Sequence, residues 1–183
     1  MVSGYCDEKF SSARELFENN LISGFERGAA ISVEIEGETV VDLWGGTDSE
    51  EENTTWQEDT IVNVFSTTKG LAAVCLLQLI EEGKVNLDDP VAKYWPEFAQ
   101  NGKKDITIRT AMSHQAGLYA ITEQLDTSSD MLNWDQALKG MEQATPTHQP
   151  DSAHGYHGFN YGYLIGGLIE KISGKKFQQV LKE

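Results

Sequence analysis

Basic residues are scarce in this sequence, and their scarcity excludes one class of partner. Fourteen Lys and Arg stand against 29 Asp and Glu, which gives a formal net charge of −15. A protein that binds nucleic acid needs clustered positive charge against the phosphates, and the sequence contains no basic cluster. We therefore expect no nucleic-acid partner. Acidic residues gather within 48–59, where we expect a solvated loop rather than a cation site.

Cysteine is also scarce, and long apolar runs are missing. The two cysteines, Cys6 and Cys75, lie far apart, and Cys75 falls among the apolar positions of an expected helix, so a buried free thiol is predicted. The longest apolar run, 71–77, is too short to cross a bilayer. The first residues lack the basic region and apolar core of a secretory signal. These absences predict a cytoplasmic protein with no membrane partner.

The segment 61–82 has the pattern of a short strand that leads into a helix. Residues 61–65 form a mostly apolar and β-branched run, and from Ser66 onward apolar residues fall mostly three or four apart until Gly83. The pattern predicts a strand over 61–65 and a helix that begins at Ser66. Lys69 then lies one turn into the helix.

Ser66 and Lys69 are the candidate catalytic pair. Residues three apart share a helix face with Cβ atoms about 5–6 Å apart, and a helical side chain leans toward the N-terminus. A serine hydroxyl needs an adjacent base to become a nucleophile, and Ser-Lys pairs are one known solution. Burial favours the neutral amine that can act as base, and the free N–H groups of the helix start favour an oxyanion. The alternative is a serine cap followed by a surface lysine.

A second S-x-x-K sequence begins at Ser173 and ends at Lys176. It follows the end of an apolar-periodic segment, close to Gly174. That is the carbonyl end of an expected helix, which opposes a developing anion. Position therefore favours Ser66 over Ser173 as a nucleophile.

The N-terminal part of the chain predicts a helix and a hairpin. Apolar residues recur with a helical period over 10–25, where Ser11 or Ser12 could cap the helix. Residues 29–35 and 39–44 are β-branched runs joined by residues 36–38, whose Gly37 allows the positive φ of a tight hairpin. We expect residues 44–46 to break the second strand.

The C-terminal part predicts helices and loops. Helices are expected over 88–95, 107–112, 133–144 and 161–172, and another begins in the last nine residues. Residues 145–159, with two prolines, form an expected loop. Asn160 is expected to cap the helix that follows, and Gly162 and Gly166 to give that helix one narrow face.

The size predicts one domain, divided into residues 1–65 with the first helix and the strands, 66–82 with the central helix, and 83–183 with the other helices. Three short strands leave an open sheet edge, and no strand is expected after them to cover it. We therefore expect the chain to be a fragment of a longer domain.

Four motifs carry a resemblance to a known family. In chain order they are Phe65-Ser66-Thr67-Thr68-Lys69-Gly70, residues 88–96, Ser113-His114-Gln115-Ala116-Gly117-Leu118, and Tyr156-His157-Gly158. Together they resemble the serine β-lactamase-related family, and within it the class C-like branch with the family VIII carboxylesterases. The resemblance implies a β-lactamase/transpeptidase-like α/β (α+β) fold, with an antiparallel sheet flanked by helices and a helical subdomain, here without its C-terminal strands.

The resemblance also implies roles for three residues. Ser66 would be the acylated nucleophile, Lys69 its proton partner and Tyr156 a second base that faces the serine from the loop. A phenol beside a lysine ammonium is pushed toward phenolate, so Tyr156 could pass protons between Ser66, the leaving group and water. Without the resemblance, Tyr156 would be read as an ordinary loop tyrosine.

Two departures from the family pattern affect the expected substrate. Relatives that hydrolyse β-lactams carry Tyr-x-Asn, whereas this chain has Tyr156-His157-Gly158, with Asn160 out of phase. The family's C-terminal strand motif, which begins with lysine or histidine and ends with glycine, has no match here. The first departure favours an ester over a β-lactam, and the second implies that part of the pocket is missing.

Histidines offer an alternative site. His148, Asp151, His154 and His157 could be read as zinc ligands, but the prolines and Gly155 make this a loop and no zinc motif supports it. We expect these histidines to be structural or incidental, and His114 to fix its own turn through hydrogen bonds. P-loop, dinucleotide and G-x-S-x-G motifs are absent from the sequence.

The resulting hypothesis is a serine hydrolase that cleaves carboxylic esters through an acyl-enzyme on Ser66. It needs no metal or organic cofactor, and its partner is a small-molecule ester or amide substrate. One alternative keeps the chemistry but takes a β-lactam or a D-amino-acid peptide. The other is a non-catalytic assembly or binding protein, for which the open sheet edge could pair with another chain, as it could in a homo-oligomer.

Overall fold

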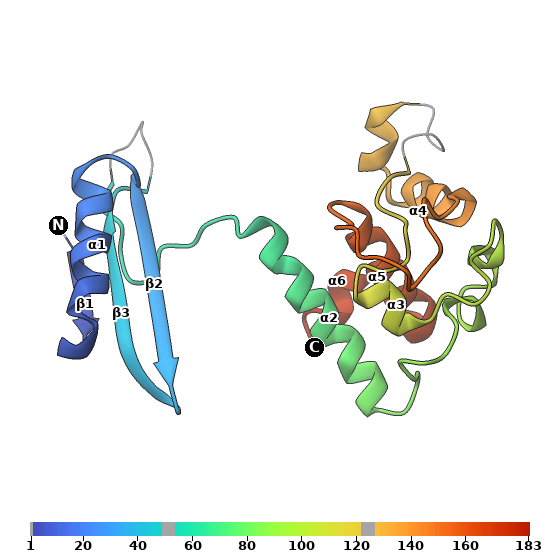
Figure 1. Ribbon diagram of the computed structural model, residues 1–183, viewed down its shortest axis with the longest axis horizontal. Coiled ribbons are helices and arrows are strands. Elements are labelled where there is room, and N and C mark those ends of the chain that lie inside the picture. Colours follow the sequence, from blue (N-terminus) through green and yellow to red (C-terminus); the bar gives the residue numbers. More distant parts are fainter. Residues whose placement is uncertain (1, 49–53, 122–126) are drawn as a thin grey trace. The chain divides into compact units, whose positions relative to one another are not determined.

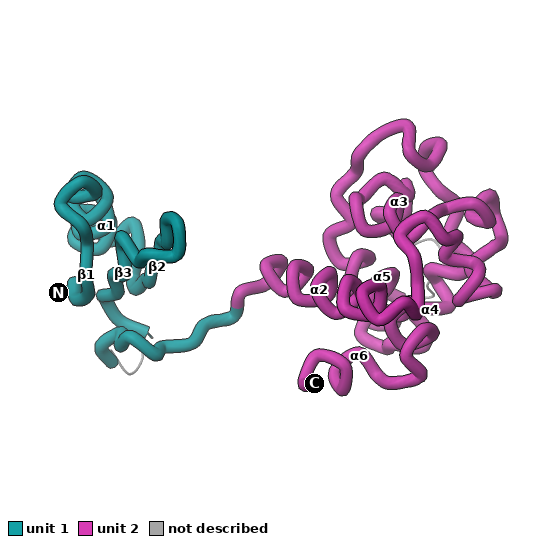
Figure 2. Tube along the Cα trace, turned by 90° about the horizontal axis from the view of Figure 1, so that it is seen from below, with its two compact units in different colours: residues 1–63 teal, residues 64–183 magenta. Residues whose placement is uncertain are grey.

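The computed structural model describes residues 2–48, 54–121 and 127–183. The chain divides into two compact units, residues 1–63 and residues 64–183 (Figure 2). Most of the acidic cluster predicted to form a solvated loop lies outside the described residues, because 49–53 are not among them. The candidate catalytic residues all belong to the second unit.

The first unit contains the predicted hairpin. Strand β2 (Gly28–Ile35) pairs antiparallel with β3 (Glu38–Gly46). The turn between them has positive φ at Glu36 (53°) and Gly37 (83°). Two consecutive positive φ angles are what the twist of a two-residue hairpin requires, so the prediction of a tight turn at Gly37 is confirmed.

A third strand, β1 (Val2–Cys6), lies on the other side of β3, so that the sheet order is β1-β3-β2 (Figure 1). The sequence did not predict this strand. Its centre is Gly4, with φ of 102°, where a Cβ atom would lie 2.0 Å from the carbonyl oxygen of Asp42. A glycine is needed for that close approach of two backbones, although glycine weakens the strand pattern in the sequence.

Two expectations about strands were wrong. Residues 61–64 form no strand, and Phe65–Thr67 is a short 3₁₀ helix. Strand β3 does not break at residues 44–46 but continues to Gly46, whose φ of 91° and close approach to the Arg27 carbonyl suit a glycine inside the sheet. Ile61, Val62 and Val64 are β-branched, but propensity alone does not make a strand.

Helix α1 (Ser11–Ile22) lies against one face of the sheet (Figure 1). It ends before Phe25, and neither Ser11 nor Ser12 caps it, because the N-cap position is Phe10, which forms no side-chain cap bond. A 3₁₀ turn, Glu8–Phe10, leads into the helix instead, with Asp7 accepting a hydrogen bond from the Lys9 amide. Val41 and Leu43, which share one face of β3, are buried.

The second unit is helical. Its long central helix is α2 (Thr68–Glu81), which is followed by Gly83 with a φ of 70°. Helix α5 (Asn160–Ser173) packs against α2 and also against α4 (Trp134–Gln143) (Figure 1). Cys75 is a buried free thiol on the inner face of α2, as predicted. Besides Phe65–Thr67, the shorter elements of this unit include the 3₁₀ helices Val91–Lys93, Pro96–Ala99 and Ser128–Leu132, α3 (Ile108–Met112) and α6 (Phe177–Val180).

Side-chain caps explain where some of these helices begin. Thr107 accepts a hydrogen bond from the Thr110 amide at the start of α3, and Asn133 accepts one from the Gln136 amide at the start of α4. The expected helix over 88–95 is only the 3₁₀ turn Val91–Lys93. Asn160 does not cap α5: its side-chain amide is buried and donates to the Leu118 carbonyl at 2.9 Å.

Glycines on α5 let large side chains approach the helix. A Cβ at Gly166 would lie 2.8 Å from the Trp134 ring, and one at Gly167 would meet Leu138 at 2.7 Å. A Cβ at Gly162 would meet nothing within 4 Å. The expected packing face of Gly162 and Gly166 is therefore corrected to Gly166 and Gly167, and Gly162 is left facing open space.

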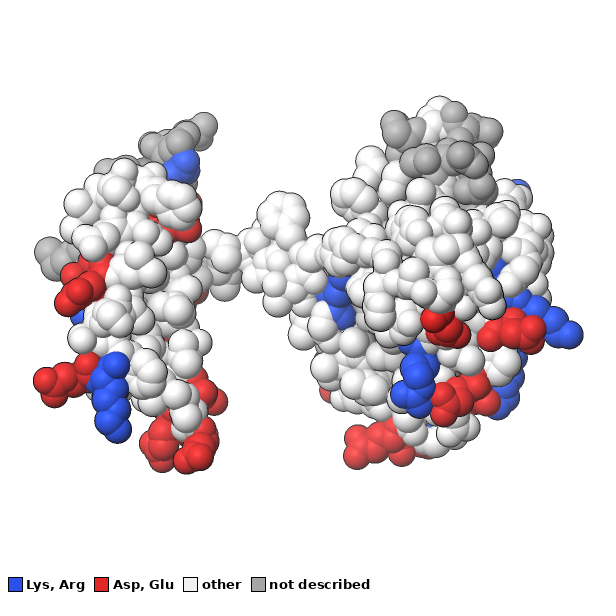
Figure 3. Space-filling model, viewed as in Figure 1, with Lys and Arg blue, Asp and Glu red and all other residues white. Residues whose placement is uncertain are grey.

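Several basic side chains of the second unit lie in ion pairs. Lys93 lies 2.9 Å from Asp89, Arg109 lies 2.8 Å from Asp88, and Lys176 lies 3.1 Å from Glu170. On the face shown in Figure 3, blue and red atoms stand beside one another and form no basic patch. Among the described residues, no helix is both long and apolar enough to span a bilayer.

Candidate active site

Ser66 lies in the 3₁₀ helix Phe65–Thr67, immediately before α2. The sequence placed the start of the helix at Ser66, and the structure inserts this tighter turn there. Phe65 has a positive φ of 43°, which is costly for a residue with a Cβ and tends to occur at functional sites. The turn leaves Ser66 exposed at the end of α2.

Lys69 reaches back to Ser66 from the first turn of α2. Its Nζ donates a hydrogen bond to Ser66 Oγ at 3.0 Å. The contact follows from the three-residue spacing and from the lean of helical side chains toward the N-terminus. A base at this distance can take the hydroxyl proton when Ser66 attacks.

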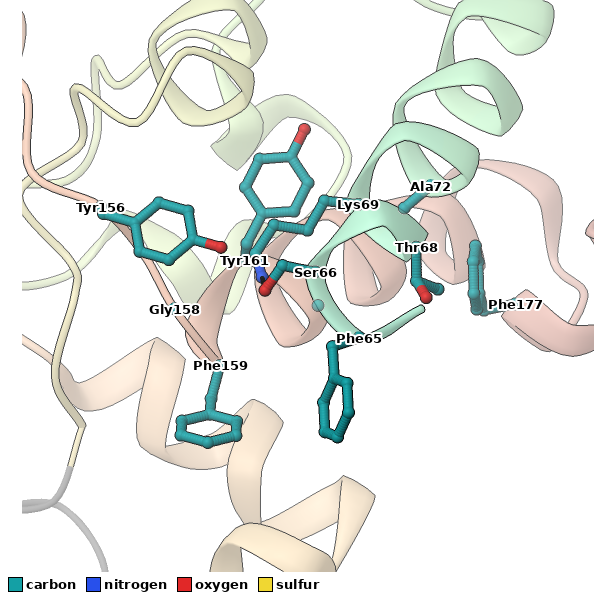
Figure 4. A pocket seen from close by; sticks show the side chains of 11 residues that line it. Phe65, Ser66, Thr68, Lys69, Ala72, Tyr156, Gly158, Phe159, Tyr161 and Phe177 are labelled. Carbon is teal, nitrogen blue, oxygen red and sulfur yellow. Dashed lines mark hydrogen bonds between the residues drawn. The ribbon is translucent and has the colours of Figure 1, made fainter. Parts of the chain in front are cut away.

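Tyr156 joins this pair from the loop before α5. Its hydroxyl points toward Ser66 and Lys69 (Figure 4), and Lys69 Nζ lies 5.0 Å from the centroid of its ring. Hydrogen bonding to Ser66, and then to Lys69, lowers the pKa of the Tyr156 phenol below its usual value. A lowered phenol pKa brings the phenolate within reach of milder pH, so Tyr156 is suited to moving a proton.

The three side chains open into a cavity of about 510 Å³ (Figure 4). The cavity wall is largely aromatic, and Phe65 and Phe159 flank Ser66 with highly exposed rings. Among the described residues that line it, Lys69 carries the only ionisable amine and no carboxylate is present. The lining residues are Phe65, Ser66, Thr68, Lys69, Ala72, Tyr156, Gly158, Phe159, Tyr161, Gly162 and Phe177.

The second S-x-x-K sequence is arranged differently. Ser173 is the last residue of α5, and its Oγ accepts a hydrogen bond from the Lys175 amide at 3.1 Å. Lys176 Nζ donates instead to a Glu170 carboxylate at 3.1 Å. In this motif the lysine amine therefore bonds a carboxylate, whereas Lys69 bonds the hydroxyl of Ser66.

One of the loop histidines, His157, is held by backbone groups. His157 is fully buried, its Nε2 accepts from the Leu118 amide at 3.0 Å, and its Nδ1 donates to the Gly155 carbonyl at 2.6 Å. Burial lowers the pKa of His157 to about 4, so its imidazole is neutral near pH 7. Within the described ranges, no group of three or more His, Cys, Asp or Glu is arranged to hold a metal ion.

Some pocket residues could not be found from the sequence. Phe65, Phe159 and Phe177 line the cavity, but no periodic pattern marks them as a group. The only signal was their position: Phe65 precedes Ser66, and Phe159 lies three residues after Tyr156 in a stretch rich in glycine. An aromatic residue close to a candidate catalytic residue in the sequence is a weak signal of a pocket, and the structure adds that the Phe65 and Phe159 rings are exposed.

Comparisons with known proteins agree on one family. The model of the family described as Beta-lactamase matches residues 13–183. Esterase/beta-lactamase LipL of Mycobacterium tuberculosis (strain ATCC 25618 / H37Rv) is 31% identical over 182 residues, which covers 100% of this chain and 42% of LipL. This chain therefore spans less than half the length of that relative.

Two solved structures are similar over the whole chain. The crystal structure of a family VIII carboxylesterase has a TM-score of 0.87 at 37% identity, with 100% of this chain and 50% of that chain covered. A novel penicillin-binding protein homolog from Caulobacter crescentus has a TM-score of 0.90 at 38% identity, with 100% and 49% covered. Both relatives share the fold of the described chain and extend over about twice its length.

Proposed function

The chain belongs to the beta-lactamase family, and from this membership we propose that it carries the nucleophile of a serine hydrolase that cleaves carboxylic esters. The observation that carries the proposal is the 3.0 Å hydrogen bond from Lys69 Nζ to Ser66 Oγ, with the Tyr156 hydroxyl pointing at the same two groups. A nucleophile within hydrogen-bond distance of a base is the arrangement that acyl transfer uses, and a second proton carrier can assist it.

The reaction proceeds in two halves. Ser66 Oγ attacks the ester carbonyl carbon, and its proton passes to Lys69 or Tyr156. The carbon–oxygen bond to the alcohol then breaks, and the alcohol leaves with the proton that the base received. In the second half, water attacks the acyl-enzyme, gives its proton to the same base and releases the acid, which restores the Ser66 hydroxyl.

An ester suits the pocket better than a β-lactam. Relatives with Tyr-x-Asn place an amide beside the tyrosine, but here the corresponding Gly158 has no side chain and His157 is fully buried. Asn160 cannot substitute for that amide, because it is buried and donates to the Leu118 carbonyl. The cavity described here thus offers no side-chain amide, and its aromatic wall favours a small, apolar ester that needs no metal or organic cofactor.

Phe159→Ala is expected to raise KM for an aromatic ester about fivefold and to change kcat less. The Phe159 ring lines the cavity and is 79% exposed, so a substrate can cover it, and partial burial of one ring contributes about 1 kcal/mol. Steady-state kinetics measures the change. Leu132→Ala is the control, since Leu132 is also highly exposed but does not line the cavity. An equal rise in KM in both variants would contradict a binding role for Phe159.

Labelling with a fluorophosphonate tests the nucleophile directly. Ser66 Oγ would attack the phosphorus, fluoride would leave, and the intact mass of the protein would rise by one phosphonyl group. We expect a single adduct on the complete gene product, its loss in Ser66→Ala, and its full retention in Ser173→Ala. The Ser173 variant is the matched control because it removes the serine of the other S-x-x-K sequence.

Two outcomes would reject the proposal. An adduct that persists in Ser66→Ala would show that another residue is the nucleophile. A folded protein with no adduct at all would favour the non-catalytic alternative, in which the fold serves assembly or binding. Turnover of a chromogenic β-lactam that matches turnover of a short ester would keep Ser66 as nucleophile but change the substrate class.

A further inference from the structure

Tyr156 lies in a stretch of chain without helix or strand, residues 153–157. Its side chain is 61% exposed, so its own burial does not fix where the phenol lies. A proton carrier must stay within hydrogen-bond distance of its partners, and a displacement of about 1 Å can cost a hundredfold in rate. Something outside Tyr156 must therefore hold it beside Ser66 and Lys69.

His114 contacts both neighbours of Tyr156. The Gly155 amide donates to the His114 carbonyl oxygen at 3.0 Å, and the His157 amide donates to His114 Nδ1 at 3.1 Å. The His114 ring also lies against the Tyr156 ring, with centroids 5.2 Å apart, and against the Tyr161 ring at 4.7 Å. One histidine thus fixes the backbone on either side of Tyr156 and packs against its ring.

The proton positions on the two histidines are set by their partners. His157 Nδ1 faces the Gly155 carbonyl, which can only accept, so that nitrogen carries the proton. His114 Nδ1 receives the His157 amide, so it must present a lone pair, and its proton lies on Nε2. Burial, followed by the charges of Lys69 and His154, lowers the pKa of His114, which keeps this imidazole neutral.

The backbone at His114 adopts a strained conformation, and its contacts with the loop that carries Tyr156 explain that strain. Its φ is 61°, a left-handed conformation that is unusual for a residue with a Cβ. That conformation lets one residue present its carbonyl oxygen and its Nδ1 to the same opposing loop. Strain of this kind persists where the surrounding structure needs it.

We propose that His114 is a positioning residue that holds the Tyr156 phenol beside Ser66 and Lys69 by accepting the His157 N–H at its Nδ1. Its effect on turnover rests on the proposed function, because it acts through Tyr156. Its effect on where the phenol lies does not depend on any activity. His114 itself does not line the cavity and is not expected to contact substrate.

Two variants of the complete gene product separate the acceptor from the backbone strain. Asn and Gly both tolerate the positive φ at position 114, but only the Asn side chain can accept a hydrogen bond in place of Nδ1. Ultraviolet titration, taken as the difference from a Tyr156→Phe variant, reports the pKa of the Tyr156 phenol. Circular dichroism confirms that each variant is folded.

We expect the phenol pKa of the native protein and of His114→Asn to lie below the usual value of about 10, and that of His114→Gly to return to about 10. For ester turnover, we expect kcat of His114→Gly to fall about a hundredfold with KM within about threefold, and His114→Asn to recover at least about tenfold of that loss. A folded His114→Gly that keeps the lowered phenol pKa would overturn the proposal.

The two readouts keep the positioning role and the proposed function apart. If the phenol pKa of His114→Gly rises to about 10 but kcat does not fall, the positioning role stands and the catalytic role of Tyr156 fails. If His114→Gly does not fold, His114→Asn decides alone. A folded Asn variant whose phenol pKa has returned to about 10 would overturn the acceptor at Nδ1, and one with the lowered value supports it.

Discussion

Replacing Lys69 by methionine is expected to lower kcat for ester hydrolysis about 10³-fold to 10⁴-fold, with KM changed much less. Lys69 Nζ donates to Ser66 Oγ at 3.0 Å, and no other amine lines the cavity among the residues described. Methionine has a similar unbranched chain, so the packing beside α2 is kept while the base is removed. Steady-state kinetics on a short p-nitrophenyl ester, together with the rate of fluorophosphonate labelling, measures the effect.

The control for this variant is Lys176→Met. Lys176 is the lysine of the second S-x-x-K sequence, and it pairs with Glu170 rather than with Ser173. We expect kcat and labelling of Lys176→Met to match those of the native protein. If both lysine variants lost activity equally, or if Lys69→Met kept native kcat while folded, Lys69 would not be the base.

Tyr156→Phe helps to interpret the same experiment. The phenol and the amine both reach Ser66, so the two groups could share the proton during acylation and deacylation. Groups that act as a unit give non-additive losses, so a double variant should lose little more than the worse single variant. Fully additive losses would indicate that Lys69 and Tyr156 serve separate steps.

The elements that could be predicted from the sequence are those whose signal is local. Gly37 marked the hairpin turn, Gly83 marked the end of α2, and Asn133 marked the start of α4. Each of these residues acts on its own few neighbours through φ or a cap. Strand β1 was missed because its partner is β3, and because Gly4, which the close pairing requires, weakens the strand pattern.

The same distinction holds in the candidate site. The contact between Ser66 and Lys69 follows from helix geometry, so the sequence alone was enough to expect it. Tyr156 approaches them through a loop far along the chain, and only the family resemblance indicated it. The burial of His157 and the bonds of His114 depend on how the turn at 113–118 packs against the chain that leads into α5, and that packing joins residues far apart in the sequence.

The buried His157, next to Tyr156 in the sequence, makes folding stability depend on pH. His157 is completely buried and has a pKa of about 4, whereas an unfolded histidine titrates near 6.5. Between these two values the unfolded chain binds a proton that the folded chain does not. The free energy of unfolding must therefore rise with pH across this window and fall as the pH drops from 6.5 toward 4.

The expected size of this effect is about 3 kcal/mol, since each pKa unit corresponds to about 1.36 kcal/mol. Urea denaturation at a series of pH values measures it. His157→Asn should lower stability at neutral pH and reduce this dependence, leaving the contribution of His114, whose pKa is also lowered by burial. His154→Gln, which removes an exposed histidine from the same loop, should retain the full dependence. The Asp89 carboxyl, whose pKa is lowered to about 2 by hydrogen bonds to Tyr94 and Lys93, titrates below this window.

A His157→Asn protein that kept the native dependence would show that another group carries it. If the dependence does belong to His157, acid should release the loop before the rest of the second unit. Protonating His157 Nε2 removes the acceptor of the Leu118 amide, and His157 is also the residue whose amide is bound by His114. Native-state proteolysis near pH 5 should then cut first within residues 147–158, and the Tyr156 phenol should lose its place beside Ser66 under the same conditions.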